Sequence, residues 1–133
     1  EVQRDTEGNV LRDTRGKTVR RPGLLRGCKA IGWYIEEYGC AQVSMNINDI
    51  TLCPIHKAYE TVCMVAQELG YEVTRTELIG LIPGQCMLDA GRYFADKESI
   101  PYANAQELTR IAVDAMRMDD LCPFDVESKI LAI

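Results

Sequence analysis

Four neutral polar side chains alternate with apolar ones between Ala41 and Asn48. Successive side chains of a strand point to opposite faces, so in a strand Gln42, Ser44, Asn46 and Asn48 would share one face. We call these four residues the polar row. Amides carry donors and acceptors together, so such a row can orient a polar ligand by hydrogen bonds. The alternative is a sheet face that simply meets solvent, which is the commoner case.

Two other sets of side chains could do chemistry. Cys53 and His56 could supply two metal ligands, but their spacing is short and no second pair accompanies them, so we expect no metal site. Asp49 and Glu77 could act as paired carboxylates, although carboxylates at strand ends are commonly solvated. The sequence has neither a P-loop nor an HExxH helix. Residue chemistry alone therefore predicts an α/β domain with a polar, ligand-facing sheet and assigns no catalytic residue.

The apolar spacing indicates the elements that must position these side chains. Leu24, Cys28, Ile31 and Ile35 recur at the helical period, and Gly39 would end such a helix. In chain order we expect helix 24–38, strand 41–48, helix 54–69, strand 71–77, helix 85–95, helix 104–118 and a short turn or helix in the tail to residue 133.

Residues 1–23 differ from the rest of the sequence. Two glycine-containing turn signals alternate there with short β-prone pieces, which predicts a hairpin or a mobile loop. We expect residues 24–133 to form a single domain and the sequence as a whole to contain no internal repeat. Two strands are too few to support a stable sheet beside this many helices, so we expect the chain to be part of a larger protein.

Charge and cysteine content limit the class of protein. The net charge is −5, yet residues 1–29 hold eight basic and four acidic side chains, so residues 30–133 are strongly acidic. An acidic body is a poor partner for nucleic acid. No apolar run approaches the roughly 20 residues of a membrane helix. Six cysteines without a CxxC pair suggest reduced thiols in a cytoplasmic protein.

Four blocks of the sequence, in order, resemble a known family. The blocks are Gly32–Glu37, Ala41–Asn46, Leu78–Pro83 and Met87–Phe94. They resemble the C-terminal subdomain of glutamate formimidoyltransferase, which also occurs in the transferase part of the bifunctional formimidoyltransferase-cyclodeaminase. The resemblance covers nearly all of residues 17–133, and four ordered blocks at similar spacing are far more specific than one.

The resemblance implies a function and a fold. The family moves the formimino group of N-formimino-L-glutamate to N5 of tetrahydrofolate, its co-substrate, in histidine degradation. Its subdomains are ferredoxin-like α/β (α+β) sandwiches, with a small, mostly antiparallel sheet and helices packed on one face. Folate lies between the two subdomains. The proposed catalytic histidine belongs to the N-terminal subdomain, so no catalytic residue is carried over to this chain.

The resemblance also sets what we expect to be missing. The first strand and helix of the subdomain would precede residue 1, so this chain by itself should be inactive and should expose a sheet edge. That edge could support a homodimer. The expected partners are folate, N-formimino-L-glutamate and the N-terminal transferase subdomain.

We therefore hypothesise that the polar row helps to line the substrate channel. Basic residues near the N-terminus could attract the glutamate tail of folate, namely Arg12, Arg15, Lys17, Arg20 and Arg21. Two alternatives stay open. One is a non-catalytic, ferredoxin-like regulatory module that binds a small ligand, and the other is a structural subdomain whose polar face docks a partner chain.

Overall fold

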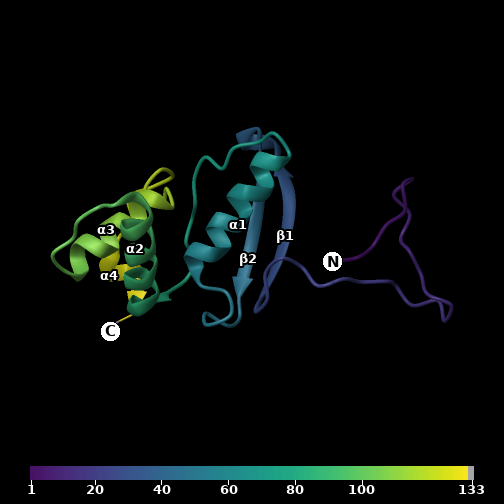
Figure 1. The fold of residues 1–133 in the computed structure, drawn as a ribbon. Helices are drawn as coiled ribbons and strands as arrows, with labels where there is room; N and C mark the ends of the chain where they lie inside the picture. Colours follow the sequence, from purple (N-terminus) through teal and green to yellow (C-terminus); the bar gives the residue numbers. More distant parts are fainter. Residues whose placement is uncertain (132–133) are drawn as a thin grey trace.

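The computed structural model describes residues 1–131 and shows a mixed α/β chain with a small antiparallel sheet, which confirms the expected fold class. An extended N-terminal arm leads into a β-hairpin beside one helix, and a unit of helices follows (Figure 1). The ferredoxin-like sandwich stays a prediction. The elements are β1 (Cys28–Ile35), the 3₁₀ turn η1 (Glu36–Tyr38), β2 (Cys40–Ile47), α1 (Ile55–Glu68), β3 (Ile82–Pro83), α2 (Gly84–Glu98), α3 (Ala105–Ala115), α4 (Val126–Lys129) and β4 (Ile130–Leu131).

The helix expected at 24–38 is wrong, because β1 and η1 occupy this segment. Ile31, Trp33 and Ile35 also follow the two-residue period of a strand. A glycine such as Gly32 inside a helix costs about 1 kcal/mol relative to alanine, which disfavours the helix. Pairing with β2 then selects the strand over the helix. The two strands are antiparallel and pair from Cys28 opposite Ile47 to Ile35 opposite Cys40. Gly39 ends η1 with a φ of 60°, which favours glycine.

Helix α1 confirms the expected helix at 54–69. Pro54 precedes its first turn and Gly70 follows its end with a φ of 82°. The helix lies beside the hairpin (Figure 1). Its only buried residue is Ala58, so it is amphipathic but poorly covered.

The strand expected at 71–77 is wrong, because residues 71–79 have no regular secondary structure. Their backbone groups bond instead to the helical unit. The Arg117 guanidinium donates to the Val73 carbonyl at 3.2 Å, and the Thr76 N–H donates to the Arg117 carbonyl at 3.1 Å. The Lys129 ammonium donates to the Leu78 carbonyl at 3.0 Å. A β-prone sequence forms a strand only where another strand pairs with it.

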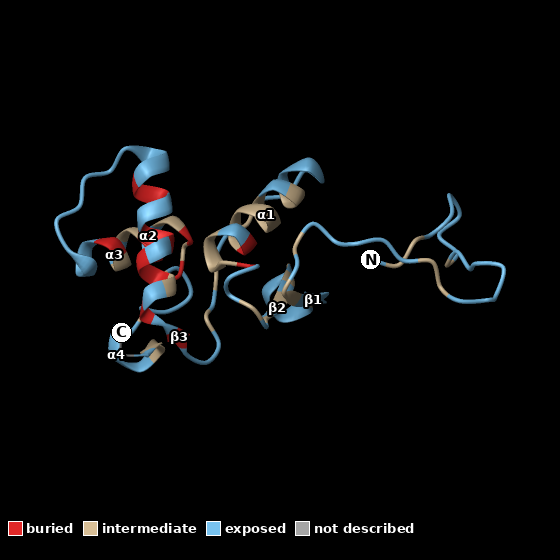
Figure 2. Cartoon of the chain, turned by 60° about the horizontal axis from the view of Figure 1, so that its bottom comes forward, coloured by how far each residue is buried: buried red, intermediate tan, exposed pale blue. Residues whose placement is uncertain are grey.

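The hydrophobic core lies in the helical unit, between α2 and α3 (Figure 2). Helix α2 confirms the helix expected at 85–95 and begins with the buried Gly84. The side chains of Met87, Val113 and Met116 are fully buried. The two helices cross closely at Gly91, where an added Cβ would lie 2.2 Å from the Leu108 carbonyl oxygen. The β-hairpin contributes no buried residue to this core.

Helix α3 starts at the predicted cap and is shorter than expected. The Asn104 side chain accepts from the Glu107 N–H at 2.9 Å, and the Glu107 carboxylate accepts from the Ala103 N–H at 2.6 Å. The helix ends at Ala115 rather than at residue 118. Helix α4 is the short element expected in the tail, and β4 then pairs in parallel with β3. Residues 132 and 133 lie outside the described part of the tail.

Residues 1–21, which we call the octad arm, form three short segments closed into a ring. Each segment bridges the other two in antiparallel fashion: Val2 with Arg20, Arg4 with Val10, and Arg12 with Thr18. Three backbone hydrogen bonds of 2.9 Å run in one cycle at the centre, with Gln3 donating to Val19, Leu11 to Gln3 and Val19 to Leu11. The ring stands away from the body of the molecule (Figures 1 and 2).

The octad arm contains an eight-residue repeat, so the expectation of no internal repeat is wrong. Residues 2–9 read VQRDTEGN and residues 10–17 read VLRDTRGK. In both units the aspartate accepts from the N–H groups two and four residues later, at 2.8–2.9 Å. In both units the arginine donates to a glycine carbonyl, from Arg4 to Gly8 and from Arg12 to Gly16. The sequence signal was the RDT triplet recurring eight residues apart.

Candidate functional site

The polar row lies on β2 and just beyond it. Gln42, Ser44 and Asn46 occupy alternate positions of the strand, and Asn48 follows its end. Gln42 and Ser44 are half-buried, whereas Asn46 and Asn48 are exposed. The backbone N–H of Asn48 donates to the Gly27 carbonyl at 2.8 Å, which fixes this end of the row. The predicted alternation is therefore present for three of the four residues.

Apolar side chains of β1 accompany the row, together with Lys29, which lies opposite Asn46. Residues directly opposite in an antiparallel pair share a face, and Gln42 lies opposite Trp33 while Ser44 lies opposite Ile31. Trp33 is 45% exposed and Ile31 is 66% exposed. The face therefore combines hydrogen-bonding groups with an accessible indole. Trp33 is not among the predicted site residues, because the apolar spacing predicts a helix at 24–38. The alternation of Ile31, Trp33 and Ile35 could have identified it.

The row forms one open wall within residues 1–131. None of its four side chains makes a hydrogen bond to another group in residues 1–131. A hollow of residues 1–131 lies elsewhere, between α1, α2 and α3, and no residue of the row lines it. A ligand held by this face would need a second surface opposite to it.

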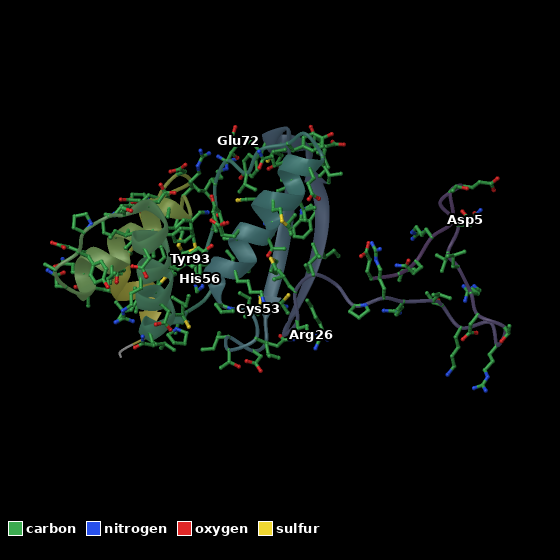
Figure 3. The ribbon with its side chains drawn as sticks, in the orientation of Figure 1. Asp5, Arg26, Cys53, His56, Glu72 and Tyr93 are labelled. Carbon is green, nitrogen blue, oxygen red and sulfur yellow. The ribbon has the colours of Figure 1, made fainter. Side chains whose placement is uncertain are left out.

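His56 is packed as a structural side chain. Its ring stacks on Tyr93 with centroids 4.6 Å apart and planes 21° apart (Figure 3). Its Nδ1 is buried and has no hydrogen-bond partner in the described residues. Burial lowers the His56 pKa, while the carboxylates of Asp89 and Glu60 oppose that effect. The neutral imidazole is therefore favoured.

The Cys53 thiol and the Asp49 carboxylate likewise have structural roles. Cys53 is fully buried, and burial together with the neighbouring Cys28 thiol raises its pKa to about 11, so it stays protonated. Residues 1–131 contain no group of three side chains that could hold a metal ion. The Asp49 carboxylate accepts from the Thr51 N–H and hydroxyl at 2.9 and 2.6 Å, and these bonds lower its pKa. Asp49 therefore stabilises the turn after β2.

The basic candidates all lie in the octad arm. Arg12 donates to the Gly16 carbonyl at 3.1 Å, and Arg21 pairs with Glu1 at 3.0 Å. Arg15 and Lys17 flank the glycine of the second turn, and both are exposed. The equivalent positions of the first turn are Glu7 and Asn9, so the second turn is the cationic one.

The arrangement can bind and orient a ligand, but it supplies no general base beside a nucleophile. A planar ligand with amide-like edges suits it chemically. Its edge can form hydrogen bonds to amides, and its face can stack on an indole.

Residues 1–131 contain no helix with both the length and the apolar composition needed to cross a membrane.

Comparison with known proteins identifies consistent relatives. A family model described as the formiminotransferase domain matches residues 7–133. The formimidoyltransferase-cyclodeaminase of Rattus norvegicus is 37% identical over 123 residues, which cover 92% of this chain and 22% of that protein. The glutamate formimidoyltransferase of Streptococcus pyogenes serotype M1 is 32% identical over 102 residues, which cover 76% of this chain and 34% of that protein. The chain spans about a fifth of the length of the bifunctional relatives.

Proposed function

Because the chain belongs to the formiminotransferase domain family, we propose that it is part of an enzyme that moves the formimino group of N-formimino-L-glutamate to tetrahydrofolate. The family match over residues 7–133 carries this proposal, and curated relatives are named for formimidoyl transfer. Tetrahydrofolate is then the co-substrate, the pathway is histidine degradation and the setting is the cytoplasm.

The polar row and Trp33 form one wall of the folate site in this proposal. A pterin ring has a planar face and an edge of amide-like donors and acceptors. Gln42 and Ser44 lie beside the exposed indole, so one ligand could contact all three side chains. Neutral groups suit this reaction because they orient the ring without competing for the proton that the transfer moves. The opposite wall would come from the N-terminal transferase subdomain, which by the family resemblance would also hold the proposed catalytic histidine.

The cationic turn of the octad arm serves the same substrate at longer range. Arg15 and Lys17 are exposed and lie in the second turn of the arm. Exposed charges attract a flexible polyanion over roughly a Debye length, about 8 Å at physiological salt. The glutamate tail of folate is such a polyanion. A Michaelis constant for the folate that does not change with salt would contradict this part of the proposal.

The direct test of the wall is Asn46→Ala in the complete enzyme. Asn46 is exposed on the polar row and outside the core, so the variant should fold normally. We expect the Michaelis constant for tetrahydrofolate to rise by about 3- to 10-fold, the usual effect of one lost hydrogen bond, while kcat changes little.

Gln67→Ala is the matched control, because Gln67 is an exposed amide on α1 and outside the row. Trp33→Phe should keep most of the affinity and Trp33→Ala should not, since phenylalanine can still stack. Unchanged Michaelis constants for both substrates in Asn46→Ala and Trp33→Ala would mean that this face is merely solvated. If the complete polypeptide bound folate but did not transfer the formimino group, the regulatory-module alternative would be favoured.

A further inference from the structure

Two thiols lie in contact where the β-hairpin meets α1. Cys28 is the first residue of β1, and Cys53 lies in the turn that leads to α1. A hydrogen bond joins the two thiols, and burial together with that bond raises the pKa of Cys53. Cys28 is half-buried, whereas Cys53 is fully buried. A small reagent in solution therefore reaches the pair through Cys28.

The backbone on both sides of the pair is held by hydrogen bonds and close packing. The Asp49 N–H donates to the Gly27 carbonyl at 3.0 Å, and the Cys53 N–H donates to the Asp49 carbonyl at 2.9 Å. Gly27 has a φ of 74°, and an added Cβ there would lie 3.0 Å from the Leu52 Cβ. The residue before Cys28 thus packs against the residue before Cys53. The fold itself brings the two cysteines together.

Cationic side chains accompany the thiols. The Lys57 ammonium favours the thiolate of Cys53 and opposes the effect of burial on its pKa. Arg26 lies two residues before Cys28, and Figure 3 shows it at the same end of the hairpin as Cys53. Positive charge near a thiol stabilises the thiolate, which is the form that reacts with oxidants.

We propose that Cys28 and Cys53 form an oxidative modification site, at which hydrogen peroxide converts the two thiols into a disulfide. The Cys28 sulfur attacks the peroxide, so that an S–O bond forms, the O–O bond breaks and one water leaves. The Cys53 sulfur then attacks the Cys28 sulfur, so that the S–S bond forms and the S–O bond breaks. The second oxygen leaves as water and takes the Cys53 proton. The thiols lose two electrons, and the peroxide is reduced to two waters.

The disulfide would join β1 to the start of α1. Because β1 pairs with β2 along its whole length, the bond would fix the hairpin, and the polar row with it, relative to the helix. It would also close residues 28–53 into a covalent loop, which stabilises a fold mainly by restricting the unfolded chain. Thiol reductants would reverse the modification. This inference concerns the two thiols and does not depend on the proposed function.

Peptide mapping of the 133-residue chain after treatment with hydrogen peroxide tests the proposal. Remaining thiols are alkylated before digestion, and fragmentation of the linked peptides assigns the cysteines. We expect a disulfide between Cys28 and Cys53 that disappears with dithiothreitol. The oxidised chain should unfold at a higher urea concentration than the reduced chain. Cys28→Ser should abolish both effects and still fold, because Cys28 is only half-buried.

Cys40→Ser is the matched control, because Cys40 is also half-buried and lies in the same hairpin. This variant should form the Cys28–Cys53 disulfide as fast as the wild type. The exposed Cys122 reports that the oxidant has reacted. If Cys28 and Cys53 were both still alkylated after Cys122 had been oxidised, the proposal would be overturned. A disulfide that joined Cys28 to any cysteine other than Cys53 would also overturn it.

Discussion

His56 shows how packing decides what a residue type can do. A histidine three residues after a cysteine could supply two metal ligands, yet the ring stacks on Tyr93 and its Nδ1 is buried without a hydrogen-bond partner among residues 1–131. The Cys53 thiol is fully buried beside Cys28 and stays protonated. The buried Nδ1 and the protonated thiol therefore do not present a pair of metal ligands in this arrangement, because coordination needs an accessible lone pair or a thiolate.

The stability of the chain should depend on pH through His56. Its folded pKa lies below the usual value of 6.5, so the unfolded state binds more protons and folding stability falls as pH drops below about 6.5. His56 is the only histidine, so the pH 5.5–7.5 window reports on it. The free energy of unfolding in urea should decrease toward pH 5.5 by less than about 1.4 kcal/mol per pH unit, the limit for one proton.

His56→Phe keeps a ring beside Tyr93 and removes the titration. Its unfolding free energy should be flat across the same window. A wild-type chain that gains stability as the pH falls, or a variant that retains the slope, would contradict the assignment.

At the scale of elements, helices and strands are specified by different kinds of information. Helices α1, α2 and α3 follow the 3.6-residue apolar period, which is local. Segment 24–38 satisfies the helical and strand periods together, and the β2 partner decides between them. Segment 71–77 has strand-forming residues but finds no partner strand, and Arg117 bonds to its backbone instead.

Helices α2 and α3 can approach closely because Gly91 has no side chain. Gly91→Ala would place a Cβ 2.2 Å from the Leu108 carbonyl oxygen, so the helices must separate. Despite the better helix propensity of alanine, we expect a loss of about 1–3 kcal/mol in unfolding free energy, the usual cost of overpacking. Urea denaturation measures it.

Gly32→Ala is the matched control for the packing of α2 against α3. Its added Cβ would lie 3.6 Å from the Gln42 carbonyl oxygen, an ordinary contact on β1. This variant should change the free energy of unfolding by less than about 0.5 kcal/mol. Equal losses in the two variants would mean that the loss at Gly91 is unrelated to the close helix crossing.

The whole molecule is unevenly packed. Its core lies in the helical unit, while the two-stranded sheet has unpaired outer edges and exposes Ile31, Trp33 and Val43. Such surfaces usually mark contacts with other chains or subdomains. The chain also spans only a fifth of the bifunctional relatives. Both facts fit a chain that functions in contact with other chains or subdomains.

The purified 133-residue chain should therefore not transfer the formimino group to tetrahydrofolate by itself. The polar row is one open wall, and the one histidine of the sequence, His56, is stacked on Tyr93. A turnover assay with both substrates measures this, with the complete enzyme as the positive control. Transfer by the chain alone at rates near those of the complete enzyme would refute the proposal that a second wall is required.

The sequence by itself determined the three long helices, the polar row on β2 and the family, because each depends on short-range spacing or on ordered blocks of residues. Only the tertiary structure decided that 24–38 pairs as a strand, that Trp33 lies beside Gln42 and that residues 1–21 close into a ring. Those features depend on hydrogen bonds between residues distant in the chain. Local spacing cannot reveal such pairing, because the energy that selects it comes from a partner strand elsewhere in the sequence.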